Sequence, residues 1–255
     1  MFELDLWIVL ALLPVYFAAG FIDSVAGGGG LIAAPAFLLT GTSPDLVLGT
    51  NKLAACMGTA SSLINYARSG LALWRMAVVG LPAALLGSFL GTRVILLFDS
   101  AYIGRLIVLL LPLGVAATLI PKKDRGRKEL TRAGLYVFTP LVCLLIGFYD
   151  GFFGPGTGSF FILALHLATG VGLLQASATA KIFNLATNLG SLAVFIFYGK
   201  VLFALGLPLA LANIAGNLLG SRMAIKIGAG FVRRVLSVSL SLLFFSLLWK
   251  FYLGA

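Results

Sequence analysis

The sequence predicts an all-α polytopic membrane protein built from two homologous repeats. Hydrophobic residues make up 60% of the 255-residue chain and charged residues only 10%, whereas a soluble domain carries about a quarter charged residues. The apolar runs are long and continuous, which indicates helices rather than the alternating pattern of a membrane β-barrel. We expect the net charge of +10 in loops that set membrane orientation, and we predict no nucleic-acid binding.

The second observation is that polar residues of the first half recur in register in the second half. Asp150 follows Asp23 by 127 residues, and Lys181 follows Lys52 by 129 residues, each within similar sequence. Internal duplication is common among secondary transporters. We divide the chain into a first transmembrane repeat at 1–120, a basic linker at 121–132 and a second transmembrane repeat at 133–255.

Each repeat contains four to five apolar helical segments, one of which is short and preceded by glycines. A stretch of about 20 apolar residues is long enough to span a bilayer. In the first repeat the segments are Leu4–Ile22, the short Leu31–Leu39, Leu46–Tyr66, Trp74–Phe98 and Tyr102–Ile120. In the second repeat they are Leu135–Tyr149, the short Phe160–Leu167, Gln175–Tyr198, Leu202–Ile225 and Val232–Tyr252.

The number of crossings depends on the two short segments. If both cross, each repeat has five spans, the chain has ten, and the second repeat is inverted. If both are re-entrant, each repeat has four spans, the chain has eight, and the repeats are parallel. We favour inverted repeats, because the basic linker should stay in the cytoplasm with Arg68 and Arg75, and only this arrangement also places Lys226 there. Glycine-rich backbone cannot face lipid, so we expect protein around both short segments.

Charged side chains inside apolar segments are costly and mark binding sites or pathways. They form three matched pairs: Asp23 with Asp150, Lys52 with Lys181, and Arg93 with Arg222. We interpret the four bases as candidates for binding an anionic substrate, and the two acids as candidates for proton coupling or gating. If all six are ionised, their sum of +2 attracts anions. The alternatives are helix capping or ion pairing for the acids, and interfacial anchoring for the bases.

Two glycine clusters each interrupt a helix just before another helix begins. The start of a helix presents unpaired N–H groups and the positive end of its dipole, which suits an anion. Close packing of helices through small residues is the alternative. With neighbouring polar side chains, these clusters give the remaining candidate substrate-binding residues: Gly27, Gly28, Gly29, Gly30, Asn51, Gly154, Gly156, Thr157, Gly158 and Asn188.

Metal, cofactor and nucleophile chemistry find little support in the sequence. His166 is the only histidine, and we expect the thiols Cys56 and Cys143 to be buried packing residues rather than metal ligands. The Gly-Pro-Gly-Thr-Gly-Ser stretch of the second repeat lacks the lysine of a phosphate-binding P-loop. We therefore expect no metal site, no cofactor and no enzymatic activity.

Two motifs give the sequence a family resemblance. Gly20-Phe21-Ile22-Asp23 with its glycine run, and Gly49-Thr50-Asn51-Lys52, resemble the sulfite exporter TauE/SafE family of membrane transporters. The second copy of the latter motif reads Thr179-Ala180-Lys181 and so lacks the asparagine. The resemblance covers essentially the whole chain. It implies transport of small sulfur-containing anions, such as sulfite or sulfoacetate, outward across the inner membrane of a bacterium or archaeon.

These observations predict a secondary transporter that exports a small anion by alternating access, with proton coupling through a buried acid. Its expected partners are a small anionic solute, such as sulfite or sulfoacetate, and the lipid bilayer; assembly into a homo-oligomer stays open. A passive anion channel and a membrane subunit of a larger complex are the alternatives. An intramembrane enzyme is disfavoured, because the chain has neither a nucleophile-elbow motif nor a histidine pair.

Overall fold

The computed structural model describes residues 6–103, 105–106, 130–228, 230–231 and 234. Within them the regular structure is helical throughout, which confirms the predicted fold class. The predicted linker at 121–132 and the last predicted segment of each repeat, Tyr102–Ile120 and Val232–Tyr252, lie largely outside the described residues.

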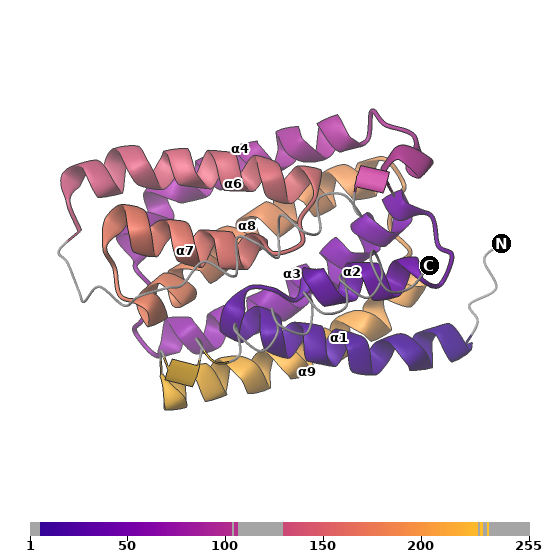
Figure 1. Cartoon of the computed structure of the whole chain (residues 1–255), viewed down its shortest axis with the longest axis horizontal. Helices are drawn as coiled ribbons and strands as arrows, with labels where there is room; N and C mark the ends of the chain where they lie inside the picture. Colours follow the sequence, from indigo (N-terminus) through magenta and orange to yellow (C-terminus); the bar gives the residue numbers. More distant parts are fainter. Residues whose placement is uncertain (1–5, 104, 107–129, 229, 232–233, 235–255) are drawn as a thin grey trace, which may run out of the picture.

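The described residues form long helices together with the shorter α2, η1 and α7 (Figure 1). The helices are α1 (Leu6–Ala26), α2 (Gly30–Leu38), α3 (Pro44–Arg68), α4 (Trp74–Ile95), the π-helical η1 (Gly134–Phe138), α6 (Thr139–Phe152), α7 (Thr157–Thr169), α8 (Leu173–Phe197) and α9 (Phe203–Ile227). In this part of the chain, α1, α4, η1 with α6, α8 and α9 are long and apolar enough to cross a membrane. The protein is therefore a multi-pass membrane protein.

The short helices α2 and α7 do not cross the bundle. They contain 9 and 13 residues, which corresponds to about 14 and 20 Å of helix against about 30 Å of hydrocarbon. In Figure 1, α2 runs back toward the end of the molecule where α1 begins, which we call the α1 end. Likewise α7 runs back toward the end where η1 and α6 begin, the α6 end. Each short helix thus forms a hairpin with the long helix before it.

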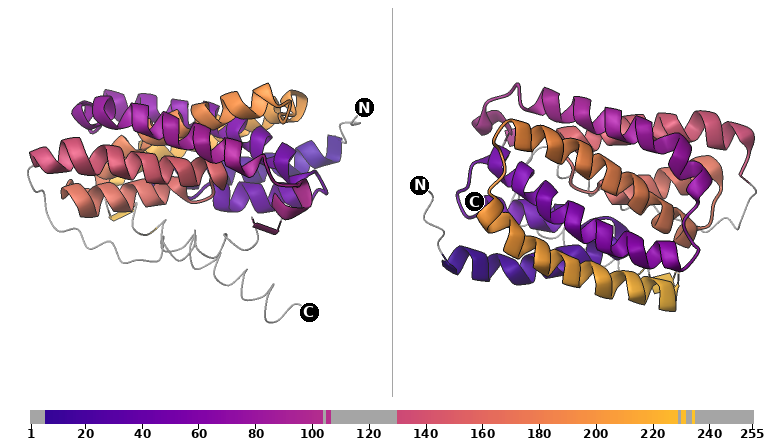
Figure 2. Two further views of the ribbon diagram at one scale, coloured as in Figure 1. Left: turned by 90° about the horizontal axis from the view of Figure 1, so that it is seen from above. Right: turned by 180° about the vertical axis from the view of Figure 1, so that it is seen from behind.

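This arrangement fits neither of the two topologies that the sequence suggested. The short segments are re-entrant, yet corresponding helices of the two halves run in opposite directions: α1 against α6, α3 against α8, and α4 against α9 (Figures 1 and 2). Re-entrant short segments give parallel repeats only if the long helix before each of them crosses the membrane fully. In the structure the long and the short helix together return to the end of the bundle where they started. The hairpin therefore leaves the chain on the same side of the membrane.

Matched hydrogen bonds join the two halves. The hydroxyl of Thr50 on α3 accepts a hydrogen bond from the backbone N–H of Leu202 at 3.0 Å. Its counterpart Thr179 on α8 accepts one from the N–H of Leu73 at 3.1 Å. These contacts support the prediction of two inverted repeats. It stays a prediction, because the last segment of each half lies outside the described residues.

Small residues set the helix packing. Helix α4 packs along α6 and α1 packs along α9, while α3 and α8 lie side by side between these two pairs (Figure 2). A Cβ atom added at Gly91 would lie 2.1 Å from the carbonyl oxygen of Phe148, and one at Gly216 would lie 2.0 Å from that of Phe17. Such close backbone approach is typical of helices packed inside a membrane.

The distribution of side chains agrees with a lipid environment. Large apolar side chains are exposed on the outer faces of the bundle, among them Trp7, Val78, Leu97 and Phe197. Polar side chains are instead buried in the interior, above all along α3 and α8. Of the charged groups that the sequence placed in apolar segments, Lys52, Lys181 and Asp150 are therefore inside the protein.

Candidate functional site

The two glycine-containing breaks meet inside the bundle. The backbone N–H of Ser159 donates to the carbonyl oxygen of Gly27 at 3.1 Å, and its hydroxyl donates to that of Ala26 at 2.6 Å. Gly27 has a φ of +77°, and a Cβ atom there would lie 2.2 Å from the carbonyl carbon of Gly158. Only glycine fits such a left-handed conformation at such close contact. The tips of the α1–α2 and α6–α7 hairpins therefore touch each other.

A small cavity of about 40 Å³ lies beside these tips and is lined from both halves. Most of the candidate residues selected from the sequence surround it. They are Asp23, Gly27, Gly29, Gly30, Asn51, Lys52, Asp150, Gly154, Gly156, Thr157, Gly158 and Asn188. The duplicated motifs, which lie more than 100 residues apart in the chain, thus build one site rather than two.

Lys52 and Asp150 form a buried ion pair at this cavity. The Lys52 Nζ lies 2.8 Å from Asp150 Oδ1, and it donates to Asn188 Oδ1 at 3.1 Å. The hydroxyl of Thr157, at the start of α7, donates to the same Asp150 oxygen at 2.7 Å. The other oxygen, Asp150 Oδ2, is buried and has no hydrogen-bond partner among the described residues.

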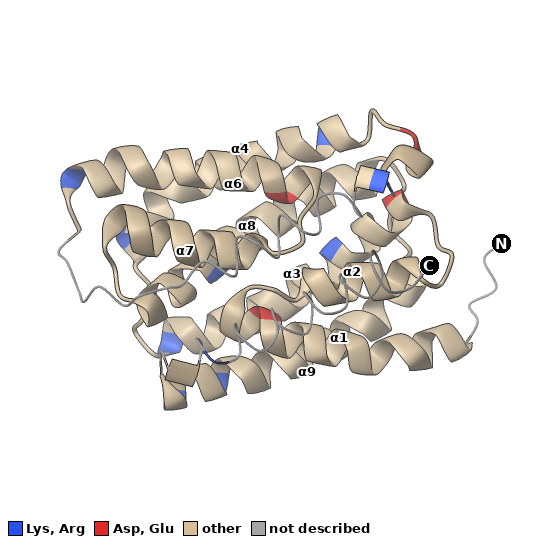
Figure 3. Ribbon diagram, in the orientation of Figure 1, with Lys and Arg blue, Asp and Glu red and all other residues tan. Residues whose placement is uncertain are grey.

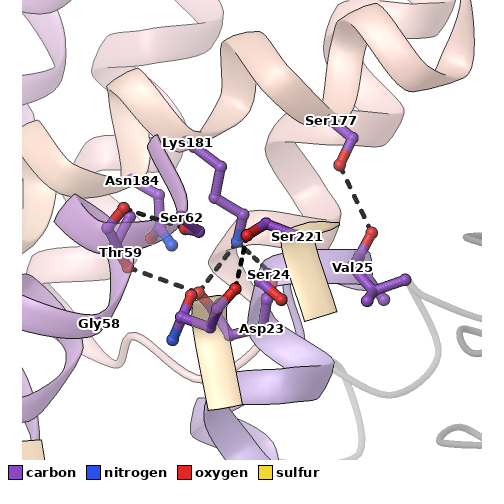
Figure 4. Close-up of polar contacts among 12 residues, drawn as sticks. Asp23, Ser24, Val25, Gly58, Thr59, Ser62, Ser177, Lys181, Asn184 and Ser221 are labelled. Carbon is purple, nitrogen blue, oxygen red and sulfur yellow. Dashed lines mark hydrogen bonds and ion pairs between the residues drawn. The ribbon is translucent and has the colours of Figure 1, made fainter. Parts of the chain in front are cut away.

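The matched pair, Lys181 and Asp23, is arranged differently (Figure 4). The Lys181 Nζ lies 2.9 Å from Asp23 Oδ2, and it also contacts the backbone carbonyl oxygen of Asp23. The hydroxyl of Thr59 lies 3.4 Å from Asp23 Oδ2. The Lys181 side chain is 0% exposed and does not line the cavity, although Asp23 does.

Each ion pair joins a lysine of one half to an aspartate of the other half. Lys52 on α3 of the first half pairs with Asp150 on α6 of the second, whereas Lys181 on α8 of the second half pairs with Asp23 on α1 of the first. Figure 3 shows the acidic segments of α1 and α6 inside the bundle. Because each buried acid has its own buried base, these four charges sum to zero. The ion-pairing alternative considered for the acids is therefore realised.

The structure does not bring every selected residue to the cavity. Arg93 and Arg222 are exposed, and the Arg93 guanidinium lies 5.6 Å from the centre of the Phe89 ring. The expected surplus of +2 around the site is consequently absent among the described residues, because it required both arginines. Gly28 and Lys181 also lie outside the lining.

Two asparagines that the sequence argument did not select line the cavity as well. Asn184 lies one helical turn before Asn188 on α8, and Asn213 lies on α9. Neither asparagine belongs to a matched polar pair or to one of the two motifs, because alanines, Ala55 and Ala84, occupy the corresponding positions of the first half. The spacing of four residues on α8 was the signal that could have found Asn184.

The chemistry of the cavity suits a small oxyanion. Helices α2 and α7 both begin at its wall, and neither has a side-chain cap at its N-terminus. Several of their first N–H groups are already bonded, since those of Leu31, Thr157 and Ser159 donate to backbone carbonyl oxygens. The positive ends of the two helix dipoles nevertheless lie at the same cavity as the Lys52 ammonium group. Asparagine amides add further donors.

Comparison with known proteins identifies the family of the chain. The family model described as "Sulfite exporter TauE/SafE" matches residues 12–247. The chain belongs to the sulfite exporter TauE/SafE family. This confirms the resemblance noted from the two sequence motifs. No solved structure matches the chain significantly.

Several bacterial relatives of this TauE/SafE protein are named as membrane transporters. "Probable membrane transporter protein ORF9" of Sinorhizobium sp is 40% identical over 87% of this chain and 85% of its own length. "Probable membrane transporter protein" of Haemophilus influenzae is 39% identical over 91% of both chains. "Probable membrane transporter protein YfcA" of Escherichia coli K12 is 34% identical over 86% of this chain and 82% of its own length. The protein is therefore a membrane transporter, which fits the expectation of a non-enzyme.

Proposed function

We propose that this TauE/SafE transporter is a secondary exporter of a small anion of the sulfite or organosulfonate class in the inner membrane of a prokaryote. The observation that carries the proposal is the cavity between the hairpin tips, where Lys52 and two uncapped helix N-termini converge. The sulfur-containing substrate and the outward direction come from the description of the family model. The inner membrane is inferred from the bacterial relatives.

The size of the cavity favours a small substrate. Its volume of about 40 Å³ is close to that of a few water molecules at most. An anion such as sulfite is of this order, whereas sulfoacetate requires the hairpin tips to separate. The oxygens of such an anion would accept hydrogen bonds from Lys52, from the helix N-termini and from Asn51 or Asn184.

The hairpin tips suggest how access could alternate. They meet in the middle of the bundle and approach it from opposite ends (Figure 1), so each closes one route to the cavity. Movement of one hairpin with its half of the bundle would open one route while the other stays closed, as in transporters built from inverted repeats. Asp23 and Asp150 are the candidates for coupling this movement to a proton.

Anion binding to the purified protein tests the proposal. We expect sulfite, or a related anion in a panel with thiosulfate, sulfate, sulfoacetate, taurine and chloride, to raise the melting temperature, because a ligand that binds only the folded state stabilises it. Lys52→Met combined with Asp150→Asn should abolish this effect. Arg93→Gln, which changes an exposed cation outside the cavity, is the matched control.

Transport in proteoliposomes completes the test. A secondary transporter shows counterflow, in which unlabelled anion on one side drives uptake of labelled anion from the other, whereas a passive channel does not. Counterflow that depends on the Lys52–Asp150 pair is the expected result. Absence of both stabilisation and flux for the whole panel would contradict the proposed substrate class.

A further inference from the structure

The two matched ion pairs have unequal surroundings, although their sequences are duplicated. Lys52 and Asp150 both line the cavity, whereas only Asp23 of the other pair does so. Lys52 also bonds a neutral acceptor, Asn188 Oδ1. At the matched position Thr59 contacts the acid Asp23 instead of the lysine. Lys52 therefore has a neutral side-chain acceptor on another helix, whereas the neutral acceptor of Lys181 is the backbone carbonyl of Asp23 itself.

Lys181 has both of its bonded partners on a single residue, whereas those of Lys52 lie on two helices. It contacts both the carboxylate and the backbone carbonyl of Asp23, near the end of α1. A cation at the carboxyl end of a helix is stabilised by the helix dipole and by the last free carbonyl groups. Lys181 therefore makes both contacts at the last turn of α1 and lies outside the cavity lining.

One carboxylate oxygen of Asp150 makes no hydrogen bond among the described residues. Its side chain is 2% exposed, and its Oδ2 atom has no hydrogen-bond partner among the described residues. An orphaned buried acceptor is costly, and a proton on this oxygen would convert it into a donor. The titratable groups that surround it in the described chain are Lys52 and Cys56 on α3, its neighbour Tyr149, and the Asp23–Lys181 pair at the same cavity.

Resting on the function proposed above, we propose that only the Lys52–Asp150 ion pair opens during transport and exchanges its carboxylate for the transported anion. The Lys181–Asp23 ion pair stays intact. The transported monoanion replaces the Asp150 carboxylate as the counter-ion of Lys52. One proton from the medium adds to Asp150 Oδ2, and the resulting O–H group donates to the anion.

The charge of the site supports this exchange. Before binding, Lys52 is positive and Asp150 is negative, so the site is neutral. After binding, Lys52 and the monoanion balance each other, and the protonated Asp150 carries no charge. The site is neutral in both states, which avoids the cost of an unpaired charge inside a membrane protein. One anion and one proton therefore bind together.

The stoichiometry of proton uptake tests the proposal. Calorimetric titration of the full chain with sulfite, in two buffers of different ionisation enthalpy, gives the protons taken up per anion once the titration of sulfite itself is subtracted. We expect a value near one for the wild type and near zero for Asp150→Asn. We expect Thr59→Val, which removes only the hydroxyl beside Asp23 at the other pair, to retain a value near one.

The outcomes separate this inference from the proposed function. Binding of sulfite without proton uptake, or uptake that persists in Asp150→Asn, would overturn the single-pair exchange and leave anion transport intact. No binding of sulfite by the wild type would overturn the proposed substrate class and the exchange with it. Arg222→Gln, which changes an exposed cation outside the cavity, is the control for loss of a charge and should also give a value near one.

Discussion

At the residue scale, the buried ion pairs make each charge dependent on its partner. Lys52 and Asp150 are almost wholly buried, so removing one leaves the other charged in a medium that solvates it poorly. Breaking a buried pair typically costs about 3–5 kcal/mol, whereas replacing both partners by neutral side chains is often close to neutral. A single substitution at Lys52 therefore confounds loss of binding with loss of stability, which is why the binding test above removes the pair.

This dependence gives a prediction for a double-mutant cycle. We expect Lys52→Met alone to lower the free energy of unfolding by about 3–5 kcal/mol. The combination with Asp150→Asn should be more stable than that single variant, since no unpaired charge remains. Unfolding of the purified variants by denaturant or heat measures the difference. Effects of the two substitutions that simply add would show that the pair is not coupled.

At the element scale, the contact between the hairpin tips requires glycine at one position but not at the next. Gly27 has a positive φ and lies against Gly158, whereas a Cβ atom at Gly28 would meet its nearest neighbours, side-chain atoms of Ile22 and Leu31, at 3.7 and 3.9 Å. The latter distances are ordinary van der Waals contacts. Two adjacent glycines of one run therefore differ in their tolerance of a methyl group.

The adjacent glycines provide a matched pair of variants. Gly27→Ala should destabilise the protein by about 1–3 kcal/mol, because its Cβ atom forces the two hairpin tips apart. Gly28→Ala should change stability by no more than about 0.5 kcal/mol. Melting temperatures of the two variants in the same detergent measure the difference. Equal stability of both would show that the tips do not touch as described.

At the scale of the whole molecule, basic residues gather toward the α6 end of the bundle (Figure 3). Helix α3 ends there at Arg68, and α9 ends there just after Lys226. Asp99 follows α4 at the opposite, α1 end. Because positively charged loops stay in the cytoplasm, the α6 end should be cytoplasmic. The opposite directions of corresponding helices place Arg68 and Lys226 on one side.

Cysteine labelling tests this topology. In a variant whose buried native thiols, Cys56 and Cys143, are replaced by alanine, single cysteines are introduced as Ser69→Cys, Lys226→Cys or Asp99→Cys. A membrane-impermeant thiol reagent should label the first two only from the cytoplasm and the third only from outside. Labelling of Ser69→Cys and Lys226→Cys from opposite sides would contradict the inverted arrangement.

Much of the site was predictable from the duplicated polar residues. Charges and helix breaks inside apolar segments are unfavourable in a membrane, so they mark functional sites or paired groups. This rule selected Asp23, Lys52, Asp150 and the two glycine clusters. Arg93 was selected by the same rule and lies outside the cavity. Register along a helix says how deep a residue lies, but the side that it faces depends on how that helix packs against its neighbours.

Hydropathy and repetition can be read along the chain, so the amino-acid sequence is enough to predict a helical membrane protein with a duplicated set of charges in apolar segments. The pairing of each lysine with the acid of the other half, the turning back of the short helices, and the exposure of Lys52 but not Lys181 to the cavity appear only in the folded protein. The physical reason is that these contacts join residues about 100 or more positions apart. Such a contact depends on the direction and packing of whole helices, which no local pattern specifies.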